Sequence, residues 1–134
     1  MSRLHAPFFA LGFVLFGCQA ADEPVDPVWG KQACGSCSML VSEPPHAAEL
    51  VTADGTRVFF DDVGCMAAYL VERDAKPRKL WVRSADAKWI DARTAKFRSG
   101  QKTPMDYGFA VASDGDLDFA HIEAAARERR GASR

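Results

Sequence analysis

Residues 48–73, AELVTADGTRVFFDDVGCMAAYLVER, decide the fold, because two short apolar segments and an amphipathic segment follow one another there. The apolar segments are Leu50–Thr52 and Arg57–Phe60, and an Asp-Gly turn at residues 54–55 separates them. Asp-Gly between two such segments is the strongest short signal for a β-hairpin. The sequence therefore predicts two antiparallel strands here.

A helix is predicted directly after this hairpin. Asp61 or Asp62 can cap its N-terminus, and the helix continues to about Arg73. Its apolar residues recur at i, i+3, i+4 and i+7, which gives the helix one buried face. These residues are Val63, Met66, Ala67 and Leu70.

The rest of the chain repeats this order of elements. Short strands are predicted at 79–83, 89–91, 95–98 and 109–112, and a final helix at about 114–130. The order strand, strand, helix, strand and then roughly the same again predicts an α+β fold. We expect two small related sheet-and-helix units of the ββαβ type, the second without a clear closing strand.

The N-terminal residues are typical of a bacterial export signal. Arg3 precedes an apolar run, Ala6–Phe16, that is too short to span a bilayer. Gly17 before Cys18 resembles a lipobox, so cleavage is predicted to remove residues 1–17 and leave a lipidated Cys18. An ordinary cleaved signal peptide is the alternative, and both interpretations predict export.

The composition suggests where the domain begins and ends. Residues 18–30 are rich in Pro, Asp and Ala, which predicts a flexible tether, residues 31–130 form the domain, and residues 131–134 form a tail. We expect the acyl chains on Cys18 to insert into a lipid membrane of the cell envelope, with the domain facing the periplasm. Gln19 after the cysteine favours the outer membrane of a host with two membranes.

The distribution of charges argues against a nucleic-acid partner. The chain has 17 basic and 18 acidic residues, a formal net charge of −1, and the two signs are well mixed. A nucleic-acid-binding protein needs a basic patch or stripe. We therefore expect no nucleic-acid partner.

Cysteine usage is the most informative part of the composition. If Cys18 carries lipid, Cys34, Cys37 and Cys65 remain, an odd number of thiols in an oxidising compartment. At least one of them stays unpaired. An exported protein that keeps a free thiol usually uses it for redox chemistry or as a metal ligand.

Cys34 and Cys37 form a C-x-x-C motif with several interpretations. The motif can be a redox dithiol, half of a zinc site, two ligands of a copper site, or a structural disulfide. In an extended backbone Cys37 and Met39 would share one face and offer a thiolate and a thioether, which select copper(I) over hard cations. Met39 could instead be an apolar core residue, because Leu40 follows it.

Two more sulfur atoms are candidate ligands. Cys65 falls in the first turn of the predicted helix, where the positive end of the helix dipole favours a thiolate. Met105 follows a Thr-Pro pair in a Gly-rich loop, where no hydrophobic periodicity explains an apolar side chain.

Several stretches in order resemble the NosL family, the nitrous oxide reductase accessory proteins, which are copper-binding lipoproteins. One departure is Ser38, where the family's usual motif is Cys-Gly-Met, and another is the additional Cys34. The matching stretches are the lipobox Leu15–Cys18, the segment Cys34–Val41, Phe59–Met66, Trp81–Val82, Trp89–Ala92 and Thr103–Gly108.

The resemblance implies a metallochaperone rather than an enzyme. Residues 31–130 would then form a copper-binding domain that passes copper(I) to an extracytoplasmic apo-cuproenzyme such as nitrous oxide reductase. Cys37 and Met39 fall on the family's Cys-x-Met metal motif, and Met105 falls in its Thr-Pro-Met stretch. Two rival hypotheses remain: a thiol-disulfide redox protein using Cys34 and Cys37, and a binding module stapled by zinc or a disulfide.

Overall fold

A computed structural model describes residues 22–134, so the expected signal peptide and Cys18 lie outside the described residues. No helix in this region is both long and apolar enough to cross a membrane. In chain order the elements are the 3₁₀ helix η1 (Pro44–His46), β1 (Ala48–Val51), β2 (Arg57–Phe60), α1 (Val63–Arg73), β3 (Lys79–Arg83), β4 (Trp89–Asp91), β5 (Phe97–Arg98), β6 (Ala110–Val111) and α2 (Phe119–Ala132).

The expected hairpin forms, with β1 inside the larger sheet and β2 at its edge. β1 pairs with β2 and with β3, and the strand order is β2-β1-β3-β4, with antiparallel pairing throughout. Leu50 faces Val58 on one neighbour and Leu80 on the other. β1 is therefore covered at both edges, and all four of its residues are buried.

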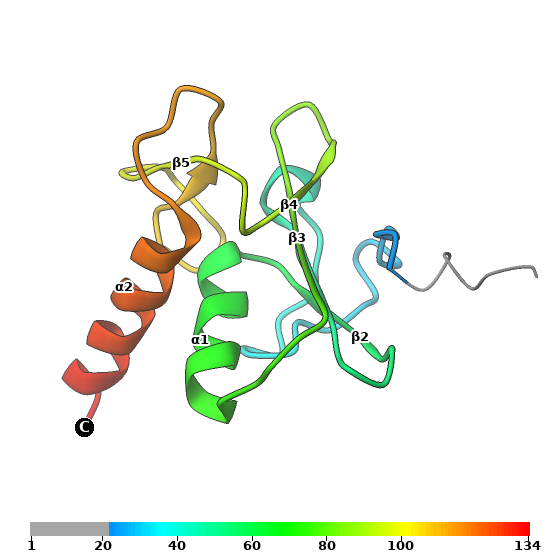
Figure 1. Ribbon diagram of the computed structural model, residues 1–134, viewed down its shortest axis with the longest axis horizontal. Coiled ribbons are helices and arrows are strands. Elements are labelled where there is room, and N and C mark those ends of the chain that lie inside the picture. Colours follow the sequence, from blue (N-terminus) through cyan, green and yellow to red (C-terminus); the bar gives the residue numbers. More distant parts are fainter. Residues whose placement is uncertain (1–21) are drawn as a thin grey trace, which may run out of the picture.

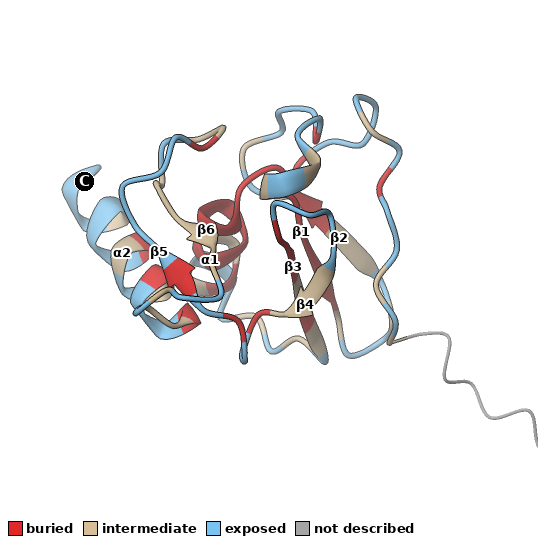
Figure 2. Cartoon of the chain, turned by 90° about the horizontal axis from the view of Figure 1, so that it is seen from above, coloured by how far each residue is buried: buried red, intermediate tan, exposed pale blue. Residues whose placement is uncertain are grey.

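α1 lies between this sheet and α2, as Figure 1 shows. The side chain of Asp62 caps α1 by accepting a hydrogen bond from the Gly64 N–H at 2.8 Å, so one of the two predicted caps is confirmed. Val63, Met66 and Leu70, predicted for its buried face, are all buried. In Figure 2 the buried residues concentrate on α1 and on the strands beside it.

The second unit is smaller than the first. It consists of the two-stranded sheet β5-β6 and α2, because Trp89–Asp91 pairs with β3 and belongs to the first sheet. The fold is thus α+β as expected, with two helices, a four-stranded antiparallel sheet and a small two-stranded sheet.

The final helix begins later than the sequence predicts, at Phe119 rather than near Asp114. Leu117 and Phe97 exchange two backbone hydrogen bonds, of 2.9 and 3.1 Å, which place Leu117 in a β-bridge outside the helix. Ser113 and Asp114 lie in a turn before it. Asp118 then caps the helix by accepting from the His121 N–H. Asp114 forms an ion pair with Arg98 at 2.5 Å instead.

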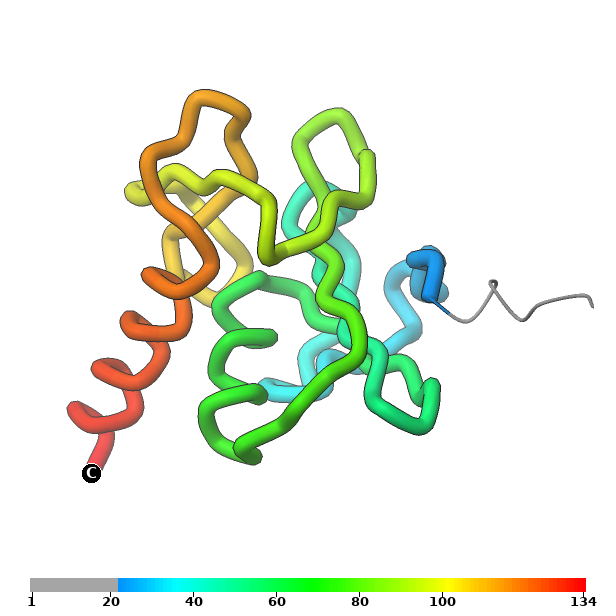
Figure 3. Tube along the Cα trace, in the orientation of Figure 1, coloured from blue at the N-terminus to red at the C-terminus, as the bar shows by residue number. Residues whose placement is uncertain are grey.

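Residues 22–30 lie against the first sheet, although the sequence predicts a flexible tether over residues 18–30. The Asp26 carboxylate accepts hydrogen bonds from Arg83 at 2.7 Å and from Trp89 Nε1 at 2.9 Å. Val25 N–H donates to the buried Glu49 carboxylate at 2.9 Å. Figure 3 shows this segment at the opposite end of the long axis from the C-terminus.

Candidate metal centre

The loop that carries the C-x-x-C motif is a tight turn, not an extended strand. Ser38 N–H donates to Cys34 O at 3.1 Å, and Cys34 N–H donates to Met39 O at 2.7 Å. Ser38 itself has a φ of 64°, in the left-handed region. The expectation that an extended backbone aligns Cys37 with Met39 is therefore wrong. Met39 is 58% exposed.

A glycine lets this turn approach the sheet. Gly35 N–H donates to Phe59 O of β2 at 2.8 Å, and a Cβ at Gly35 would lie 2.3 Å from Val58 Cγ1. The close approach brings the C-x-x-C turn beside the end of β2 and the start of α1.

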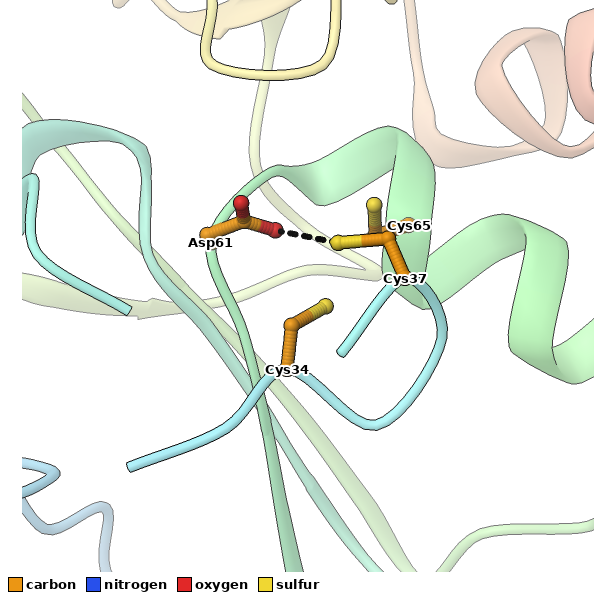
Figure 4. Close-up of side chains that lie close together, drawn as sticks. All are labelled: Cys34, Cys37, Asp61 and Cys65. Carbon is orange, nitrogen blue, oxygen red and sulfur yellow. Dashed lines mark hydrogen bonds between the residues drawn. The ribbon is translucent and has the colours of Figure 1, made fainter. Parts of the chain in front are cut away.

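The turn, the end of β2 and the first turn of α1 bring four ligand atoms together. Figure 4 shows the side chains of Cys34, Cys37, Asp61 and Cys65 gathered at this point. One sulfur from each cysteine and one carboxylate oxygen all lie within 4.8 Å of one another. The Cys37 thiol donates to Asp61 Oδ1 at 3.5 Å. We call this set the thiol cluster.

The thiol cluster has a closed side and an open side. Cys34 and Cys65 are only 3% and 2% exposed, whereas Cys37 is half-buried. All three cysteines are free thiols in this structure. An incoming group would therefore meet Cys37 first.

The cluster shifts the pKa of each thiol in a different direction. A hydrogen bond from the Cys65 thiol lowers the pKa of Cys34 to about 6, and the same bond raises the pKa of Cys65. Burial raises the pKa of Cys37 to about 11. At Cys65 the neighbouring Cys34 thiol and burial therefore oppose the helix dipole, which favours a thiolate.

Asp61 is the member of the cluster that sequence reasoning missed. The sequence leaves Asp61 and Asp62 as alternative helix caps, and the structure gives that role to Asp62. The Asp61 side chain is thereby free to face the thiols, and Asp61 is only 3% exposed. Asp61 precedes the extended cap residue Asp62 and lies outside α1, so helical spacing gave no signal for its contact with the thiols.

The structure places Met105 at the same end of α1 as Cys65. Met105 N–H donates to Asp62 Oδ2 at 3.1 Å, and the Met105 side chain is partly buried against the core. The Tyr107 ring packs on Gly64, where a Cβ would lie 1.9 Å from Tyr107 Cγ. The structure thus brings Cys34, Cys37 and Cys65 together, holds Met105 nearby and leaves Met39 largely in solvent.

Three sulfur atoms and one carboxylate oxygen can bind a thiophilic metal ion. Thiolates suit copper(I) and zinc, and zinc also accepts a carboxylate ligand. The hydrogen bond from Cys65 lowers the pKa of Cys34, which favours a thiolate at this position. The arrangement is therefore chemically able to hold a metal ion.

Comparison with known proteins supports the expected fold. The sequence matches no protein-family model and no curated protein sequence. A crystal structure of the copper chaperone NosL from Shewanella denitrificans superposes with a TM-score of 0.55, at 18% identity, over 78% of this chain and 87% of that chain. In its fold, this chain is similar to NosL.

Proposed function

We propose that this protein is a copper(I) metallochaperone without catalytic turnover. The observation that carries the proposal is the thiol cluster: three free thiols from two separate segments, with their sulfur atoms and an Asp61 oxygen within 4.8 Å. The similarity in fold to a copper chaperone supports the choice of metal. Soft sulfur donors favour copper(I) over hard cations.

Cys37 is the principal ligand in this proposal. It is the most accessible member of the cluster, and Cys34 and Cys65 lie behind it. Met105 supplies a thioether from the α1 end of the site, and Met39 supplies one from the solvent side. Copper leaves by ligand exchange. A thiol or imidazole of the recipient binds the ion beside Cys37 before the buried thiolates dissociate from it.

The proposal extends to the cellular setting. The export signal and the lipobox support a protein anchored by lipid on Cys18 to the cell envelope and facing the periplasm, in the outer membrane if the host has two. Its recipient would be an extracytoplasmic apo-cuproenzyme, with nitrous oxide reductase as the candidate that the resemblance implies.

Anaerobic copper(I) titration against a competing chelator tests the proposal. We expect the protein carrying Cys18→Ser to bind one copper(I) ion tightly, and Cys37→Ser to lose retention. Ser42→Ala, an exposed change near the same loop, is the control. Copper retention that is the same with and without the Cys37 thiol would contradict the proposal.

Zinc is the second candidate cargo, and Asp61 is the observation that favours it. Three cysteines and one carboxylate form a complete four-ligand set for a structural zinc site. Native mass measurement distinguishes the possibilities, because copper, zinc and a Cys34–Cys37 disulfide give different masses. A metal-free protein with that disulfide would favour the redox hypothesis.

A further inference from the structure

We propose that Asp62 and Arg129 are positioning residues that hold Met105 beside the thiol cluster, where its thioether can join a bound copper(I) ion. This inference rests on the proposed function. It concerns two residues that contact the Met105 backbone and that the C-x-x-C and Thr-Pro-Met motifs do not include.

Asp62 connects the Met105 loop to the start of α1. Its side chain is fully buried, and each carboxylate oxygen accepts a different backbone N–H. Oδ1 accepts from Gly64 at 2.8 Å, and Oδ2 accepts from Met105 at 3.1 Å. Hydrogen bonds to a charged acceptor are stronger than neutral ones. The carboxylate that caps the helix carrying Cys65 therefore also fixes the backbone of Met105.

Arg129 holds the same residue from α2. Its guanidinium donates to Met105 O at 3.0 Å and lies 4.3 Å from the centre of the Tyr107 ring. The Tyr107 ring packs in turn on Gly64 in the first turn of α1. Arg129 thus links the last turns of α2 to the loop between β5 and β6.

The two contacts hold the Met105 N–H and the Met105 carbonyl, one on each side of its Cα atom. Within the loop, Asp106 N–H donates to Thr103 O at 3.2 Å, and Gly108 N–H donates to Thr103 Oγ1 at 3.1 Å. The Met105 backbone is therefore held in place, and its side chain packs partly against the core. A pre-positioned ligand costs less ordering entropy when the metal binds.

The experiment compares copper(I) affinity in Arg129→Ala, Arg129→Lys and the control Arg127→Ala, each with and without Met105→Leu. Arg127 is an exposed arginine of the same helix. Groups that orient metal ligands are worth about 10- to 100-fold in affinity. Because Arg129 is exposed, we expect Arg129→Ala to weaken copper(I) binding about 10-fold, at the lower end of that range. Arg129→Lys should restore part of the loss, and Arg127→Ala should change nothing.

The Met105→Leu background separates positioning from general stability. If Arg129 acts through Met105, Arg129→Ala has no further effect once the thioether is gone. A metal-free measurement adds to this: the NMR signal of the Met105 methyl group should shift in Arg129→Ala and stay in place in Arg127→Ala.

Two outcomes overturn the inference while leaving the proposed function intact. One is unchanged copper(I) affinity in Arg129→Ala, and the other is an equal loss in the Met105→Leu background. Failure of the unsubstituted protein to bind copper(I) refutes the proposed function, and with it this role of the two residues.

Discussion

Gly64→Ala tests the packing between α1 and the Met105 loop. The new Cβ would lie 1.9 Å from Tyr107 Cγ. Carbon atoms in good contact are about 3.5 to 4.0 Å apart. The Tyr107 ring and its loop must therefore move by roughly 2 Å, the difference between these distances.

Two effects of opposite sign set the size of the change. Replacing a helical glycine by alanine stabilises a helix by up to about 1 kcal/mol. Forcing an extra methyl group into a packed site costs about 1 to 3 kcal/mol. Since the clash is severe and involves the base of the ring, we expect a net loss of about 2 kcal/mol, which lowers the melting temperature by roughly 5 to 10 °C.

Gly131→Ala is the matched control, because a Cβ at this helical glycine would meet nothing within 4 Å. We expect Gly131→Ala to raise stability and Gly64→Ala to lower it, measured by urea and thermal unfolding. In a Tyr107→Ala background, Gly64→Ala should lower the free energy of unfolding much less. Equal changes in stability from Gly64→Ala and Gly131→Ala would refute the packing argument. It would also be refuted if Gly64→Ala destabilised the Tyr107→Ala protein as much as the unsubstituted one.

Two further predictions concern acidic side chains. Asp61→Asn should weaken zinc(II) binding by about tenfold or more, because even groups that only orient a metal ligand contribute this much. It should change copper(I) binding little. Chelator competition with both metals checks this prediction, and equal losses of affinity for the two metals would contradict it. Burial raises the pKa of Glu49, so the folded state favours its protonated form, and the stability that this confers is lost as the pH rises above the ordinary glutamate value of about 4.3. Glu49→Gln should remove that decline, measured by urea unfolding from pH 4 to 7, and parallel curves for the two proteins would show that Glu49 is not its cause.

Local sequence signals determined much of the first unit. The Asp-Gly turn, the apolar strands and the spacing of Val63, Met66 and Leu70 each favour the element that forms, because they depend on neighbouring residues alone. The start of α2 was mispredicted because it depends on a distant contact. Leu117 pairs with Phe97, and no signal near Asp114 reveals that pairing.

The candidate site divides in the same way. The sequence by itself determined that sulfur chemistry was available, since it holds Cys34, Cys37 and Cys65 as candidate thiol ligands. Only the tertiary structure decided which atoms meet. The tight turn at Ser38 leaves Met39 exposed, the close approach at Gly35 brings Cys34 and Cys37 to Cys65, and Asp62 takes the cap so that Asp61 can face them. These contacts depend on how separate segments of the backbone pack together. Side-chain periodicity within one segment does not encode that packing.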